Sequence, residues 1–360
     1  MSLWCSYTRS IETHESYPLI DRDGVWLNGA EFVWNGVSAN TDLTLSGKNH
    51  NDIVETWTST KNGYERSILE NKPLSTPPVE EHKKETKVLS GRFCLFGSWW
   101  PGHYGHTMHD SLPIYEKLKQ SLPNNIKFLI PSFGSTSELL KLLDRSWEER
   151  IVEFEIGQPV KVNGDVYFYN LDNIGSYWHG IQHHREPIMK TLRKQEENIE
   201  TENIVFCPRE GDNRNGRGNS KNDQEVIIET ITKIAKTKGA NFKVFRYKEH
   251  PTPGLQKEFF KDATVIFGVH GTALTNMLWS SRICSHTQKP LQVIECVGLT
   301  DAYIEMDGFQ SGNDIGYYSQ FNNGMNVKWT HLFYHPICGK FDNVRVNITQ
   351  IKTTIEKALS

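Results

Sequence analysis

The chain has 360 residues, of which 37% are hydrophobic and 23% charged, and its formal net charge is −3. This length suits two domains of ordinary size. A nearly neutral chain creates no global field that attracts nucleic acid or an anionic membrane, so the composition argues against a nucleic-acid-binding protein. No stretch approaches the roughly 20 apolar residues of a membrane span, and we expect no integral membrane segment in this chain.

The first residues, MSLWCSYTRS, lack the apolar core of a signal peptide, which predicts a cytoplasmic protein as the chain stands. The Golgi or endoplasmic-reticulum lumen is the alternative if an N-terminal anchor has been removed. The six cysteines are scattered, without a Cys-x-x-Cys pair. Three of them lie in apolar, strand-like segments, and we predict buried free thiols rather than a disulfide framework at Cys94, Cys207 and Cys296.

The first half of the chain predicts strands at residues 24–34 and 87–97, which are rich in aromatic and β-branched residues. An exposed polar loop is expected between them, at residues 58–86. A helical pattern then runs from Gly102 to about Leu122. Short elements alternate after it, with strands expected at 128–131, 151–155 and 165–169 and helices at 136–146 and 186–198.

The second half alternates more regularly, with expected strands at 204–208, 242–247, 264–269 and 291–296 and helices at 223–237, 253–262 and 272–281. Unbroken apolar strands that alternate with helices predict a parallel sheet covered on both faces, and hence a Rossmann-like domain from about 200 to 330. The last helix, 347–359, should dock one apolar face on the body through Ile348, Ile351, Ile355 and Leu359. We therefore expect an α/β fold with domains at 1–198 and 199–360.

The segment VIFGVHGTALTNMLW (265–279) contains a strand, a turn at His270-Gly271 and a helix that begins at Thr272. Ligands of open α/β sheets bind at the carboxyl ends of strands, where the N–H groups of a helix N-terminus suit a diphosphate. Gly271 would let the backbone approach closely, and Thr272 would be a good N-cap. His270 could donate to a phosphate oxygen, and the first turns carry two more polar residues within reach, Thr275 and Asn276. The alternative is an ordinary strand–turn–helix joint.

HGTALTN resembles the HGAGLTN signature of glycosyltransferase family 61, which includes enzymes that use UDP-xylose or UDP-N-acetylglucosamine. The alanine and glycine of that signature are replaced here by Thr272 and Ala273. The preceding segment, 255–266, is similar to the family's helix–strand lead-in, with Gln256 at its usual glutamine. VIEC (293–296) matches a family strand that ends in an acid, here Glu295, which could bind the ribose hydroxyls of a nucleotide or be a solvated charge at the strand end.

The loop CPREGDNRNGRGNSKND (207–223) lies between a predicted strand and a predicted helix. The family carries arginines in this region and a polar pair at the start of the helix, and the resemblance places these roles on Arg209, Arg217 and the pair Asn222-Asp223. A departing nucleoside diphosphate develops negative charge, which arginine's planar fork can neutralise when no metal is present. The alternative is an exposed polar loop.

The segment GHYGHTMHDSLPIYEKL (102–118) carries three histidines and an aspartate. At about 100° per residue, His103, His106 and Asp110 fall within about a 60° arc of an α-helix, and His109 points away. Family 61 has a histidine, an aspartate four residues later and then a proline; His106, Asp110 and Pro113 reproduce this pattern. The resemblance implies that these residues face a cleft opposite the nucleotide.

Inverting transfer needs a base that takes the proton of the acceptor hydroxyl. Asp110 is our candidate for this base, with His106 orienting the acceptor or acting in its place. His103, Tyr104 and Trp100 are expected on the acceptor side, where the aromatic rings could stack on a sugar or pack in the core.

Two α/β halves, with the motif-rich half second, suggest the GT-B fold, in which two Rossmann-like domains face each other across a cleft. The acceptor domain would be residues 1–198 and the nucleotide-sugar domain residues 199–360. The expected activity is inverting transfer of xylose, N-acetylglucosamine or a similar sugar from a UDP-sugar to a hydroxyl of a glycan or glycoconjugate. We expect neither a cofactor nor a required metal, because the one Asp-x-Asp, at 21–23, lies in a polar turn.

Two other functions remain open from the sequence. The first is a zinc-dependent hydrolase, since His103, His106 and His109 have side chains that bind zinc. The second is a module that binds a nucleotide or a sugar without catalysis.

Overall fold

The computed structural model describes residues 6–7, 24–37, 40–49, 53–60, 63–69, 84–97, 102–170, 198–208, 221–269, 271–284, 288–298, 326–334 and 347–360. The chain divides into two compact units. The N-terminal unit is Ser16–Ile188, and the C-terminal unit combines Met1–Glu15 with Met189–Ser360. The start of the chain belongs to the C-terminal unit because β1 (Ser6–Tyr7) pairs with its strand β14 (Val327–Tyr334).

The N-terminal unit contains an eight-stranded mixed sheet of order β5-β4-β3-β2-β9-β6-β7-β8. The bounds of its strands are β2 (Val25–Val37), β3 (Asn40–Lys48), β4 (Val54–Thr60), β5 (Gly63–Leu69), β6 (Lys87–Gly97), β7 (Lys127–Pro131), β8 (Ile151–Phe154) and β9 (Val160–Asn170). Strands β2 to β5 form an antiparallel meander, whereas β6, β7 and β8 are parallel neighbours. Since β9 also pairs parallel with β6, the parallel part of this sheet is β9-β6-β7-β8.

The strands expected at 24–34 and 87–97 are confirmed as β2 and β6. The loop expected at 58–86 is wrong in its first part, because β4 continues to Thr60 and β5 follows at Gly63. Strand β5 pairs with β4 over its whole length, from Thr60↔Gly63 to Val54↔Leu69. The sequence of β5, GYERSIL, shows no regular alternation of apolar and polar residues that would predict a strand. The strand forms through its backbone hydrogen bonds with β4.

The described helices of the N-terminal unit are α1 (Tyr104–His106), α2 (Leu112–Ser121) and α3 (Thr136–Leu143), with a π-helical turn between α1 and α2 at Thr107–Ser111. A 3-10 turn, Arg145–Trp147, follows α3. The core beneath α2 is aromatic. Trp147 packs edge-on against Phe128 with 4.9 Å between the ring centroids, and Tyr115 packs against Phe96 at 5.1 Å. The helical pattern expected after Gly102 is thus confirmed.

The C-terminal unit contains a sheet of order β1-β14-β13-β12-β10-β11. Its strands are β10 (Asn203–Cys207), β11 (Asn241–Val244), β12 (Val265–Val269), β13 (Leu291–Gly298) and β14, all parallel to their neighbours, with β1 antiparallel at the edge. This confirms the parallel sheet expected from the alternation of elements. When the five parallel strands are numbered in chain order, their spatial order across the sheet is 2-1-3-4-5. The direction in which successive strands are added therefore reverses between β10 and β12.

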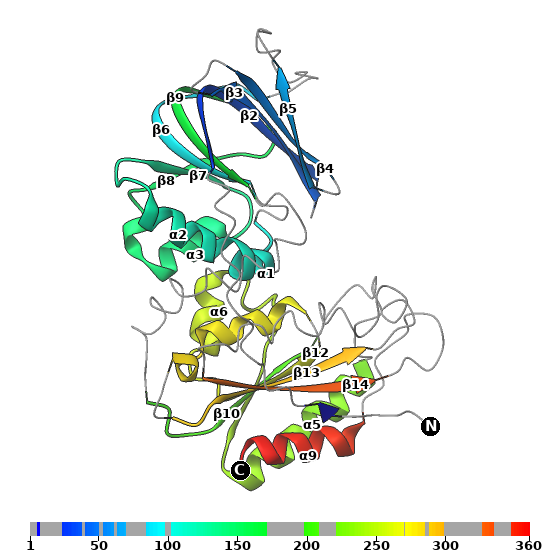
Figure 1. Cartoon of the computed structure of the whole chain (residues 1–360). Coiled ribbons are helices and arrows are strands. Elements are labelled where there is room, and N and C mark those ends of the chain that lie inside the picture. Colours follow the sequence, from blue (N-terminus) through cyan, green and yellow to red (C-terminus); the bar gives the residue numbers. More distant parts are fainter. Residues whose placement is uncertain are drawn as a thin grey trace. The chain divides into compact units, whose positions relative to one another are not determined.

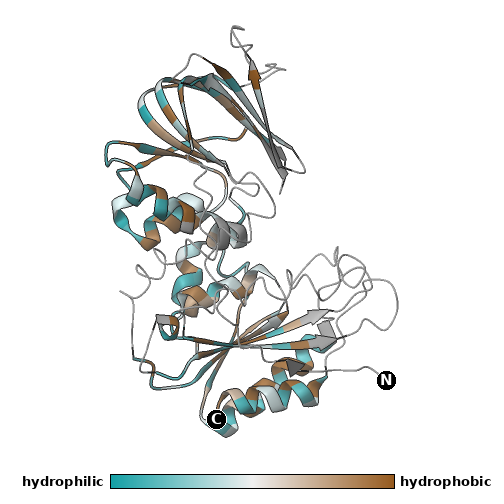
Figure 2. Ribbon diagram, in the orientation of Figure 1, coloured by the Kyte–Doolittle hydropathy of each residue, from teal (hydrophilic) through white to brown (hydrophobic). Residues whose placement is uncertain are grey.

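Helices cover both faces of this sheet. Helices α5 (Lys221–Lys238) and α9 (Ile348–Ala358) lie on one face, and α6 (Pro253–Phe260) lies on the other (Figure 1). Figure 2 shows apolar and polar stripes along α5 and α9. Ile351 and Ile355 are fully buried against the sheet, which confirms the docking face expected for the last helix.

The three thiols predicted to be buried and free are so in the structure, at Cys94, Cys207 and Cys296. Among the described residues, no helix combines the length and apolar character needed to cross a membrane.

Candidate functional site

The switch of the C-terminal sheet brings two predicted segments to neighbouring positions. Strands β10 and β12 are adjacent, and Cys207 at the end of β10 pairs with Gly268 near the end of β12. In the sequence, Pro208 follows the last residue of β10, and the arginine-rich segment begins directly after it at Arg209. His270 directly follows Val269, the last residue of β12. Ligands of open α/β sheets bind in the crevice at the carboxyl ends of the strands where the order reverses. Both predicted segments therefore leave the sheet at its carboxyl edge, where such a crevice is expected.

Gly268 is required by the close packing at this point. A Cβ added to it would lie 2.9 Å from both the Cβ and the backbone oxygen of Cys207, and 3.1 Å from Cδ2 of Leu274. Since Cys207 belongs to the adjacent strand and Leu274 to the helix after β12, the glycine lets all three segments meet. Gly268 is not among the predicted site residues, although an isolated glycine in an apolar strand is a sign of close approach.

The segment after β12 differs from the expected α-helix. It is a 3-10 helix, η4 (Thr272–Trp279), and Gly271 is its N-cap residue, so the expectation that Thr272 is the N-cap is wrong. Gly271 has φ 160° and ψ 172°, an extended backbone that other residues also adopt. Every side chain from Leu274 to Trp279 is buried, so this part of η4 has no solvent-facing stripe.

Thr275 and Asn276 are fully buried within this turn. The Asn276 amide donates to Oε1 of Gln256 at 3.0 Å and to the backbone oxygen of Ala273 at 3.2 Å. Gln256 is itself buried on α6. The hydrogen bond from Asn276 to Gln256 therefore joins η4 to α6.

Glu295 lies inside β13, which continues to Gly298, so it does not end the strand as expected. Its side chain is fully buried, and it is therefore not a solvated charge. Trp329 Nε1 donates to its Oε2 at 3.0 Å, and Nε2 of His331 lies 3.2 Å from the same oxygen. Burial, together with the charge of Glu295, raises the pKa of the neighbouring Cys296 thiol. Both partners of Glu295 come from β14, whose Trp-x-His alternation places the two side chains on one face.

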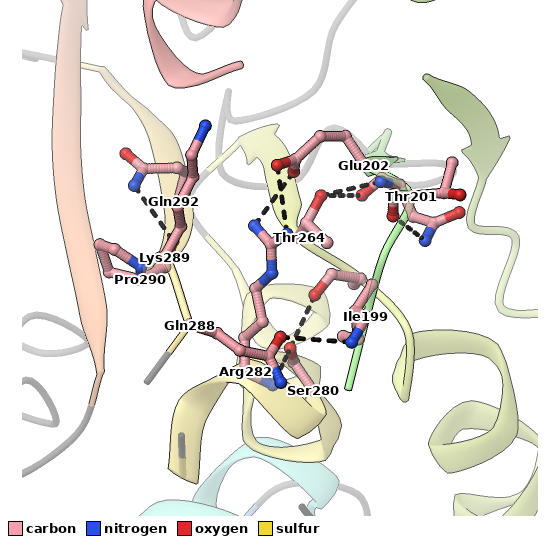
Figure 3. Close-up of polar contacts among 12 residues, drawn as sticks. Ile199, Thr201, Glu202, Thr264, Ser280, Arg282, Gln288, Lys289, Pro290 and Gln292 are labelled. Carbon is pink, nitrogen blue, oxygen red and sulfur yellow. Dashed lines mark hydrogen bonds and ion pairs between the residues drawn. The ribbon is translucent and has the colours of Figure 1, made fainter. Parts of the chain in front are cut away.

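A separate polar network fastens the opposite, amino edge of the sheet (Figure 3). The guanidinium of Arg282 forms two hydrogen bonds with the carboxylate of Glu202, at 3.0 and 3.1 Å. The Thr264 hydroxyl accepts from the backbone amide of Asn203 at 2.8 Å. Because Asn203 and Thr264 lie at the amino ends of β10 and β12, this network anchors the fold away from the carboxyl-edge crevice.

The predicted catalytic pair lies on the helical segment of the N-terminal unit. His106 ends α1, and Asp110 lies in the π-helical turn Thr107–Ser111. Each residue of a π-turn rotates the backbone through a smaller angle than a residue of an α-helix does. The 60° arc derived for a continuous α-helix therefore does not hold across this turn. The side chains of His106, His109 and Asp110 lie outside the described residues. His103 is exposed, and Tyr104 is partly buried.

The start of this helical segment is held in place by the loop before α3. The hydroxyls of Thr107 and Thr136 are 3.3 Å apart and buried. Gly102 and Gly134 cross in contact, both with positive φ (79° and 78°), and a Cβ on Gly134 would clash with the backbone of Gly102. The π-turn is therefore supported by tertiary contacts, and single π-turns are frequent at functional sites.

Several predicted site residues fall outside the described part of the chain, namely Trp100, Arg209, Arg217 and His270. Asn222 lies at the start of α5, but its side chain is not described. Among the described residues, no three His, Cys, Asp or Glu side chains gather as a metal site would require. The zinc alternative rests on His103, His106 and His109. The side chains of His106 and His109 are not among those described, so this alternative stays a prediction.

Comparison with curated proteins gave no match. A family model described as Glycosyltransferase 61 matches residues 104–287, just over half of the chain. The match begins at the helical segment that carries His106 and Asp110 and includes η4 and the 3-10 turn Ser281–Cys284 that follows it. The family expected from the sequence is confirmed: the chain belongs to glycosyltransferase family 61.

Proposed function

We propose that the protein moves a sugar from a UDP-sugar to a hydroxyl group of a glycan or glycoconjugate, with inversion at the anomeric carbon and without a required metal. Family membership supports sugar transfer. The observation that carries the donor site is the pairing of Cys207 with Gly268, which makes β10 and β12 neighbours at the switch of the sheet. The donor sugar is xylose, N-acetylglucosamine or a similar sugar, and the enzyme is of the GT-B class.

In this proposal the diphosphate of the donor binds at the carboxyl ends of β10 and β12. His270 and the backbone of Gly271 and Thr272 contact the phosphates, because the first amides of a helix suit an anion. Arg209 and Arg217 neutralise the charge that develops on the departing diphosphate. The Asn276–Gln256 hydrogen bond supports this geometry by fastening η4 to α6.

The transfer itself needs a base on the acceptor. As the acceptor oxygen attacks the anomeric carbon, the base takes the hydroxyl proton, and the bond between the anomeric carbon and the phosphate oxygen breaks. The electron pair of that bond leaves with UDP, and the configuration inverts. Asp110 is the proposed base, with His106 as the residue that orients the acceptor. The supported π-turn at Thr107–Ser111 gives Asp110 a defined backbone position.

Turnover and binding of Asp110→Asn test this assignment. The expected result is a fall in kcat of about 100- to 10,000-fold, the range for removal of a general base, with unchanged affinity for UDP. UDP release from UDP-xylose and UDP-N-acetylglucosamine is measured against a panel of glycan acceptors. Glu149→Gln is the control, because Glu149 is an exposed acid of the same unit. Wild-type turnover in Asp110→Asn would refute the role of Asp110, and UDP binding without wild-type turnover on any acceptor would favour the non-catalytic module.

A further inference from the structure

The turn after β11 presents a tyrosine at the same edge of the sheet as the crevice. Strand β11 is the neighbour of β10, and Phe206 pairs with Val244 at its end. The ladder continues one step further, because the amide of Phe245 donates to the oxygen of Phe206 at 2.8 Å. Tyr247 follows two residues later, and 61% of it is exposed. Its ring is therefore displayed at the carboxyl edge instead of packing in the core.

An aromatic cluster anchors this turn from below. Phe245 is buried, and its ring lies 5.0 Å from that of Phe260 and 5.7 Å from that of Phe259. The ring of His250 lies 4.3 Å from the ring of Phe259. Residues at both ends of the turn therefore pack against α6, which restricts the position of the backbone at Tyr247.

Hydrogen bonds within the turn restrict it further. The amides of Glu249 and His250 donate to the backbone oxygen of Arg246, at 3.0 and 3.2 Å, and the His250 amide also contacts the oxygen of Tyr247 at 3.1 Å. A ring that is held before its ligand arrives loses little conformational entropy on binding. The backbone at Tyr247 is preorganised in this sense.

The position of the turn fits one part of the donor. Neighbouring strands lie about 4.8 Å apart, so the ends of β11 and β12 are separated by about 10 Å, with the end of β10 between them. A nucleoside diphosphate whose phosphates lie at the β12 end can place its ribose across β10 and its base at the end of β11.

We propose that Tyr247 stacks on the base of the donor nucleotide and that the β11 turn is the nucleoside subsite. This inference rests on the proposed function, because it requires a nucleotide donor at the β10–β12 crevice. A phenol ring provides a flat apolar face for the base. The buried Glu295 is then not needed for contact with the nucleoside.

Calorimetric titration of the full chain with UDP tests the subsite. Aromatic–base stacking accounts for about a five- to 150-fold loss of affinity on alanine substitution. We expect that loss for Tyr247→Ala, affinity within about twofold of wild type for Tyr247→Phe, and equal behaviour of all three proteins towards inorganic pyrophosphate. The matched control is Val226→Ala, an exposed apolar residue on α5.

Three results would overturn the inference. Wild-type affinity of Tyr247→Ala for UDP would show that the ring makes no contact. Equal losses in Tyr247→Ala and Tyr247→Phe would assign the effect to the hydroxyl and not to stacking. Absence of binding of UDP, GDP and CDP to the wild-type protein would reject the proposed function itself, and the subsite with it.

Discussion

The hydrogen bond between Asn276 and Gln256 leads to a prediction about how much each side chain stabilises the packing of η4 on α6. Both side chains are buried, and the bond at 3.0 Å joins η4 to α6. We consider Gln256→Met and Asn276→Leu, which replace each amide by an apolar group of similar size. Leaving a buried polar partner unsatisfied costs about 1–3 kcal/mol.

The two changes should differ in size for a structural reason. In Gln256→Met, the Asn276 amide keeps its second acceptor, the backbone oxygen of Ala273. The expected loss is therefore at the low end, about 1 kcal/mol. Asn276→Leu removes both hydrogen bonds and leaves the Gln256 oxygen buried without this donor, so its loss should be about 2–3 kcal/mol. The double variant should cost at least about 1 kcal/mol less than the sum, since replacing both partners removes the unsatisfied group.

Hydrogen–deuterium exchange of the full chain measures this effect locally. The chain has two units, so a single global unfolding transition would mix their stabilities. Peptides that cover residues 265–279 should exchange about fivefold faster in Gln256→Met and at least tenfold faster in Asn276→Leu. Gln158→Met, the same change in the other unit, should leave these peptides unaffected. Strict additivity of the two single variants would refute the coupling.

Three further predictions concern the rest of the fold. Ile351→Ala should lower the stability of the C-terminal unit by about 2–5 kcal/mol, because the side chain is fully buried; unchanged exchange protection of α9 would contradict its docking. Arg282→Met should speed exchange at the amino edge of the sheet while UDP affinity stays at the wild-type value; a selective loss of affinity would place that network in the site. Alkylation followed by mass spectrometry should find Cys94, Cys207 and Cys296 unmodified in the native protein at pH 8, because burial raises the pKa of each thiol and keeps it protonated; rapid modification of any of them would contradict its burial.

The elements that could be predicted are those in which the apolar positions of the sequence are also the buried positions of the structure. Strand β12 is a run of five buried residues, Val265–Val269, and it was expected from an unbroken apolar segment. Helix α9 was expected from isoleucines at helical spacing, and Ile351 and Ile355 are the residues that the sheet covers. In both elements the local sequence alone carries the signal.

Other elements depend on partners far away in the sequence. Strand β5 has a polar sequence and forms because β4 pairs with it. The 3-10 winding of η4 had no local sign, because side chains from Leu274 to Trp279 are all buried and a helix without a polar stripe gives no periodic signal.

The candidate site divides along the same line. The sequence placed Arg209 and His270 after two strands, but only the pairing of β10 with β12, which skips β11, makes those strands neighbours. Glu295 was identified as a strand acid, whereas its burial depends on Trp329 and His331, more than thirty residues later. Non-local pairing of this kind leaves no mark in the segment itself.

Calorimetric titration of UDP into wild type and His270→Ala, each with and without EDTA, tests the central claim most directly. We expect saturable UDP binding that survives EDTA and is strongly weakened in His270→Ala. Absence of nucleoside diphosphate binding, together with stoichiometric zinc and destabilisation by EDTA, would contradict the proposed sugar transfer and favour the zinc-dependent hydrolase.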